Sequence, residues 1–176
     1  MWWCAWSSYD EEFKDQLNKL GKISKDGVRD LVKCPPKAWC RAYFDTQCKN
    51  MMVDNNFIES FNAWILEARV KPIIKMLEDI RVQVMRLLGK NEKQLRTWVT
   101  DFSPECMKLY INFRAIAHGC KVEFNRDWSY EMSDGEDRHT VNLEQKKCTC
   151  RIWDLSGIPC PHAIKALTHK KVDSIT

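Results

Sequence analysis

The feature that most constrains the fold of this chain is a set of four potential metal ligands in its last third. Cys148 and Cys150 are separated by one residue, and after nine further residues Cys160 and His162 flank a proline. Residues two apart on a strand point to the same face, so both sulfurs of the first pair can reach one ion. Pro161 stiffens the turn within the second pair. The spacing therefore predicts that all four side chains meet at one site.

The ligand types indicate zinc. Three thiolates and one imidazole form the tetrahedral Cys₃His shell typical of structural zinc, whereas a catalytic zinc keeps one position for water. The alternative is that these are free thiols and a surface histidine crowded by chance in a cysteine-rich chain. Both pairs together, at a predicted strand-to-helix junction, favour zinc. Zinc binding of ~10–16 kcal/mol then acts as folding energy for a small module.

The other cysteines and histidines are not expected to bind metal. The chain has nine cysteines, and its apolar start, Met1–Trp6, is too short and lacks the basic flank of a signal peptide. We therefore expect a reducing compartment, where clustered cysteines indicate metal rather than disulfides. The cysteines expected to be buried structural thiols are Cys4, Cys34, Cys40, Cys48, Cys106 and Cys120. The histidines expected at the surface or in packing are His118, His139 and His169.

The fold class expected is α+β, with a mainly helical N-terminal body over residues 1–120. Phe13, Leu17 and Leu20 recur at helical spacing, and Ser7 or Ser8 is available as a cap. Further helices are expected over residues 28–32, 36–44, 57–68, 72–89, 91–100 and 104–117.

A small ββα zinc-binding module is expected over residues 121–176. Residues 122–124 and 128–132 alternate apolar and polar side chains, as a half-buried strand does. Residues 133–137 form a turn, and residues 140–143 form another strand that runs towards Cys148. The closing helix is expected to begin at Pro161.

The charge distribution suggests a partner. Residues 1–145 hold 22 basic and 22 acidic residues, whereas residues 146–176 hold six basic and two acidic ones. The six basic residues are Lys146, Lys147, Arg151, Lys165, Lys170 and Lys171. These cations can contact DNA phosphates. They can also form an ordinary solvated face, or balance the net charge of −1 on a Cys₃His zinc site.

Base-specific readout is not expected, because no recognition helix with base-reading side chains stands out. A second function, from a different class, is protein–protein interaction through an apolar N-terminal patch of Trp2, Trp3 and Trp6. No apolar stretch approaches the ~18 residues of a membrane span, and no motif indicates a small-molecule substrate.

The segment from Cys148 to His162 resembles the SWIM-type zinc finger. More narrowly, it resembles the finger near the C-terminus of plant Mutator-like element (MULE) transposases. The segments Trp39–Phe44, Asp54–Trp64 and Pro72–Arg81, together with Ala68 and Arg69, extend this likeness in the same order over nearly the whole chain.

The resemblance implies a nuclear, catalytically incomplete fragment. Family members carry an RNase H-like domain whose three acidic residues hold divalent metal for DNA cleavage and strand transfer. The first two precede the region seen here, and Glu59 is the candidate for the third. A single carboxylate cannot hold the two ions of an in-line phosphoryl displacement, so this chain is not expected to be an enzyme by itself. Glu59 also fits a local capping box with Asn56. The DNA contacted is expected to be non-specific sequence or transposon ends.

Overall fold

The computed structural model describes residues 1–54, 56–126 and 128–171. It divides into two compact units, one formed by Met1–Val53 together with the chain from Cys106 onwards, the other by Asp54–Glu105. The domain boundary at residue 120 stays a prediction, although the chain does change there from helix to strand. No helix within the described residues is both long and apolar enough to cross a membrane.

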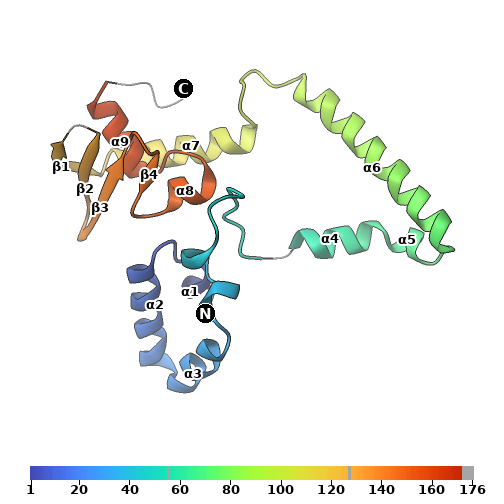
Figure 1. Cartoon of the computed structure of the whole chain (residues 1–176), viewed down its shortest axis with the longest axis horizontal. Coiled ribbons are helices and arrows are strands. Elements are labelled where there is room, and N and C mark those ends of the chain that lie inside the picture. The colour runs from blue at the N-terminus through green and yellow to red at the C-terminus, as the bar shows by residue number, and fades with distance from the viewer. Residues whose placement is uncertain (55, 127, 172–176) are drawn as a thin grey trace. The chain divides into compact units, whose positions relative to one another are not determined.

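The N-terminal part of the first unit is helical, as expected (Figure 1). It contains the α-helices α1 (Trp2–Trp6), α2 (Asp10–Ile23) and α3 (Lys25–Lys33), followed by two short 3₁₀ helices, η1 (Pro36–Ala38) and η2 (Arg41–Tyr43). Neither Ser7 nor Ser8 caps α2. The N-cap is Tyr9, which makes no side-chain cap hydrogen bond. The Glu12 carboxylate instead accepts a hydrogen bond of 2.7 Å from the backbone N–H of Ser8. A carboxylate in the first turn is also favoured by the helix dipole.

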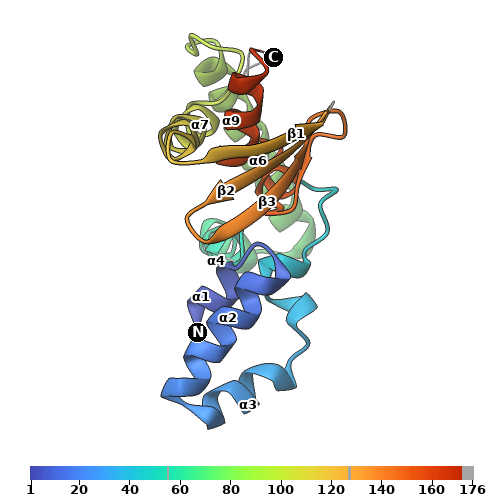
Figure 2. The same ribbon diagram turned by 90° about the vertical axis from the view of Figure 1, so that its left-hand side faces the viewer.

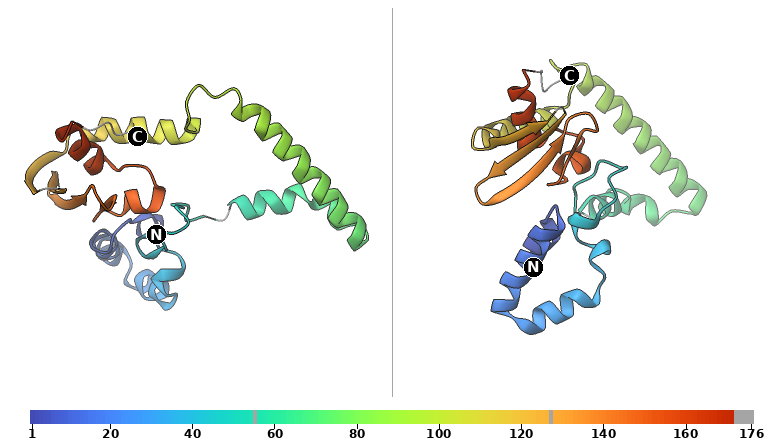
Figure 3. Two further views of the ribbon diagram at one scale, coloured as in Figure 1. Left: turned by 45° about the horizontal axis from the view of Figure 1, so that its top comes forward. Right: turned by 60° about the vertical axis from the view of Figure 1, so that its left-hand side comes forward.

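The second unit contains α4 (Asn56–Trp64), α5 (Leu66–Arg69) and α6 (Ile73–Leu95). Figure 3 shows α6 as one uninterrupted helix, so the expected stop at Gly89 and the separate helix over residues 91–100 were wrong. Glycine in a helix interior is less favourable than alanine by only about 1 kcal/mol. The apolar pattern on both sides of Gly89 is sufficient to continue the helix through it. The side chain of Phe57, part of the expected apolar stripe, lies outside the described structure.

The C-terminal part of the first unit begins with α7 (Pro104–Ala117) and continues as an antiparallel sheet in the order β1-β2-β3-β4. The strands are β1 (Lys121–Arg126), β2 (Ser129–Asp134), β3 (Asp137–Asn142) and β4 (Lys147–Cys148). Two helices follow, α8 (Ile152–Ser156) and α9 (Pro161–His169). The mixed helical and antiparallel-sheet architecture is therefore confirmed. The expected ββα plan is not, because the described chain after residue 120 forms four strands and two helices.

One face of this sheet forms the core around the candidate site. Tyr130 pairs with Val141 and Met132 with His139, and all four side chains are buried. Alternate residues of a strand share a face, so these pairs present a continuous buried surface. The helix α9 packs against all four strands (Figure 2).

Candidate metal centre

Local backbone geometry brings the two ligand pairs together. Cys148 ends β4, where it pairs with Val141 of β3, and Cys150 lies in the turn that follows. The strand argument for this pair was therefore wrong: Arg151 has a left-handed backbone with φ of 61°, and the chain leaves the sheet before Cys150. A tight turn, not the pleat of a strand, aims both sulfurs at one point.

The second pair is positioned by the start of α9. Cys160 is the N-cap residue of this helix, and its sulfur accepts a hydrogen bond of 3.4 Å from the backbone N–H of Ala163. Pro161 occupies the first helical position, where its fixed φ suits the helix and its missing N–H costs nothing. The short helix α8 is followed by Gly157, whose φ of 74° favours glycine and reverses the chain towards Cys160.

The four ligand atoms converge closely. The sulfurs of Cys148, Cys150 and Cys160 and a ring nitrogen of His162 all lie within 4.8 Å of one another. The Nδ1 atom of His162 is 3.7 Å from the Cys148 sulfur and 4.0 Å from the Cys160 sulfur. Zinc bonds of about 2.3 Å to sulfur and 2.0–2.1 Å to nitrogen imply tetrahedron edges of about 3.5–3.8 Å. The observed spacings are close to those edges, so the residues fit a tetrahedral zinc ion.

All four side chains belong to the core. Their exposed fractions are 5% or less, and the three sulfurs are part of the cluster that contains Tyr130, Met132 and Trp153. The pKa of the Cys160 thiol is raised, first by burial and then by the hydrogen bond with Cys148. Backbone hydrogen bonds at Cys148, Cys150 and Cys160 act in the opposite direction and favour the thiolate. Metal binding must therefore displace protons from a buried thiol cluster.

The orientation of the His162 ring decides which of its nitrogens can bind a metal ion. Burial, and then the neighbouring His139, lower the pKa of His162 to about 4, so the ring is neutral near pH 7. Since Nδ1 faces the sulfurs, a metal-bound ring carries its proton on Nε2. The Nε2 atom is buried and makes no hydrogen bond within the described residues. The carboxylate oxygen Oδ2 of Asp134 lies 3.7 Å from it.

A second possible ligand group shares this histidine. Cys120, Asp134 and His162 also have ligand atoms within 4.8 Å of one another. Because a single imidazole is common to both groups, and the first offers four buried donors, the second is best understood as the surroundings of the first. Sequence reasoning did not identify Asp134, since an aspartate at the end of a strand carries no signal of its distant partner.

The histidines and cysteines that were not expected to bind metal lie in different environments. His139 is buried and its ring lies 4.3 Å from that of His162, which fits the expected packing role. His118 and His169 are exposed. The expectation of burial holds for Cys4, Cys40 and Cys120, but it was wrong for Cys34, Cys48 and Cys106, which are exposed.

Glu59 lies in α4 with its side chain exposed. Within the described residues it belongs to no group of three or more potential ligands. In a capping box with Glu59, Asn56 would be the N-cap, the residue just before the helix. Asn56 is instead already the first helical residue of α4. Asn55, part of the segment that carries the resemblance, lies outside the described residues.

The six basic residues are not equivalent. The Arg151 guanidinium donates a hydrogen bond of 2.7 Å to the backbone carbonyl of Phe44, which connects the site to the N-terminal part of its unit. Lys170 places its ammonium over the ring of Trp128. Lys165 is half-buried on α9, whereas Lys146, Lys147 and Lys171 are exposed.

Comparison with known proteins supports zinc binding. Residues 139–171 match the model of the SWIM zinc finger, a segment that contains all four potential ligands. Neither the curated proteins nor the solved structures give a significant match. The Cys/His cluster and the matched segment together support a zinc-binding module in this part of the chain.

Proposed function

We propose that Cys148, Cys150, Cys160 and His162 hold one structural zinc ion, and that the module so stabilised contacts DNA. The observation that carries the zinc proposal is the convergence of four buried donors within 4.8 Å. They complete a tetrahedral shell by themselves, which is typical of structural rather than catalytic zinc. The ion would join β4 to α9 and thereby close the core around Met132 and Trp153.

The DNA contact is supported by charge. The excess of basic residues lies after residue 145, and most of these side chains reach solvent. Contacts to phosphates bind without reading sequence, so we expect DNA affinity that is non-specific or directed to transposon ends by other means. This role would place the protein in the nucleus.

The proposal extends to origin and catalysis. The segments that resemble plant Mutator-like transposases support descent from such an enzyme, and Glu59 is the candidate for the third residue of its acidic set. A solitary carboxylate does not hold two divalent ions. The chain is therefore proposed to bind DNA without cutting it.

Elemental analysis of zinc in the purified full chain tests the site. We expect one zinc ion per chain, lost in both Cys160→Ser and His162→Ala, and retained in Cys34→Ser, which alters an exposed cysteine. Zinc retained by both ligand variants refutes the assignment. Titration of DNA at increasing salt tests the second step: about four phosphate contacts to a duplex predict a slope of log K against log[salt] of about −3.6.

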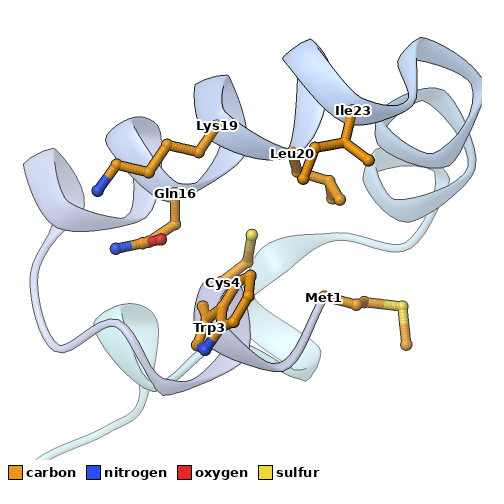
Figure 4. A pocket seen from close by; sticks show the side chains of 7 residues that line it. All are labelled: Met1, Trp3, Cys4, Gln16, Lys19, Leu20 and Ile23. Atoms are coloured by element: carbon orange, nitrogen blue, oxygen red, sulfur yellow. The ribbon is translucent and has the colours of Figure 1, made fainter.

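A protein-interaction role is the second candidate, and one observation favours it. Trp2 and Trp3 of α1 are 61% and 70% exposed. Trp3 also lines a hollow of about 350 Å³, where Trp3 and Cys4 of α1 face Leu20 and Ile23 of α2 (Figure 4). Self-association or partner binding that is insensitive to salt, without DNA affinity, would support this role over the first.

A further inference from the structure

One end of the sheet brings an exposed aromatic ring together with basic side chains. The alternation of Trp128 with Tyr130 and Met132 predicts that Trp128 shares their buried face. The strand β2 begins only at Ser129, however, and the Trp128 side chain is 49% exposed. Its backbone is held in place, because its carbonyl accepts a hydrogen bond of 2.9 Å from the N–H of Leu143. A fixed backbone therefore presents a half-exposed indole.

The basic residues reach this end of the sheet from two elements. Asn142 of β3 pairs with both Ser129 and Lys147. The turn between β3 and β4, which carries Lys146, therefore lies at the same end of the sheet as the start of β2 (Figure 2), and Trp128 directly precedes that start. Lys170, just after α9, places its ammonium over the Trp128 ring. Glu144 is the acidic residue in that turn, so lysines prevail there among the described residues.

We propose that this surface, formed by Trp128, Lys146, Lys147 and Lys170, binds single-stranded nucleic acid. An unpaired base stacks on the face of the indole opposite the Lys170 ammonium, and the lysines contact the phosphates on either side of the base. Aromatic stacking combined with basic side chains is the usual basis of sequence-tolerant single-strand binding. The bases of a duplex are already stacked on one another, so Trp128 gives an advantage only to unpaired bases. This inference rests on the proposed DNA contact and specifies that the single-stranded form is the preferred ligand.

The test measures the affinity of the zinc-loaded full chain for a labelled oligothymidylate and for a duplex of equal length, by fluorescence anisotropy. Trp128→Leu is expected to weaken single-strand binding by about 5-fold to 150-fold, the range for one lost base stack. Trp128→Phe keeps an aromatic ring and should restore most of the affinity. Trp3→Leu removes a similarly exposed tryptophan elsewhere and should change nothing.

A double substitution tests the lysines. Lys146→Ala with Lys147→Ala should make the salt slope for the single strand shallower by about 1.4, since each phosphate contact contributes about 0.7. An unchanged slope would refute the phosphate contacts. Zinc content measured on every variant shows that the module remains folded.

The outcomes separate this inference from the proposed function. If Trp128→Leu binds oligothymidylate as tightly as the unaltered chain, or loses duplex and single-strand affinity equally, the stacking site is refuted. Salt-dependent DNA binding would then still support the proposed function. If neither DNA binds at low salt, both proposals fail.

Discussion

Replacing Asp134 by asparagine should weaken zinc binding without removing a ligand. The Asp134 carboxylate lies 3.7 Å from Nε2 of His162, longer than a hydrogen bond of about 2.7–3.2 Å. A small rotation of the half-exposed aspartate closes this gap. The carboxylate would then accept the Nε2 proton and keep the Nδ1 lone pair directed at the metal. The amide of an asparagine side chain lacks the charge that strengthens this bond.

The expected magnitude is about tenfold in affinity, or ~1.4 kcal/mol. Losing a partner of a metal-bound histidine typically costs about 10-fold to 100-fold. The Asp134 side chain is 46% exposed, so solvent screening places the effect at the lower end of that range.

A competition assay with a chromophoric zinc chelator at constant pH measures the change. Glu136→Gln is the matched control, because it removes one negative charge from the exposed turn that directly follows Asp134. We expect near-normal affinity for Glu136→Gln and weakened affinity for Asp134→Asn. Equal losses in both variants, or no loss in Asp134→Asn, would refute the orientation argument.

The same geometry supports three further predictions. Cys160→Ser should abolish stoichiometric zinc and the near-ultraviolet circular dichroism of the C-terminal core, whereas Cys34→Ser should alter neither; normal spectra in the first variant would contradict a structural role. Zinc should be released as the pH falls from about 7 towards about 4, because protons compete for the thiolates. Ultrafiltration followed by elemental analysis of the free zinc at each pH measures the release, and zinc fully retained at about pH 4 would contradict ligation by thiolates. Met132 is fully buried in the core, so Met132→Ala should lower the free energy of unfolding by about 2–5 kcal/mol; a loss below about 1 kcal/mol would show that the sheet face is not tightly packed.

Several elements could be predicted because their signals are local. The apolar spacing of Phe13, Leu17 and Leu20 predicted α2, and Pro161 marked the start of α9. The candidate ligand set was also evident, since two short Cys/His spacings leave few other interpretations. The reason is that turns and helix starts depend on residues only a few positions apart.

Other features were decided by contacts between distant parts of the chain. No local pattern indicated that Asp134 faces His162, because the register of β2 against β3 and the packing of α9 on the sheet set that distance. The alternation of apolar residues also misplaced Trp128, whose exposure depends on where β2 begins. The exposure of Cys34, Cys48 and Cys106 could not be predicted either. A thiol is small and weakly polar, so it is tolerated both in the core and at the surface.

The sequence by itself determined which residues are candidate zinc ligands and where most of the helices form, because ligand chemistry and helical periodicity depend on neighbouring residues. The tertiary structure alone decided which ring nitrogen of His162 faces the sulfurs, which carboxylate faces the other nitrogen, and which lysines remain available to a partner. Those properties depend on distances across the sheet, and these exist only once the chain has folded.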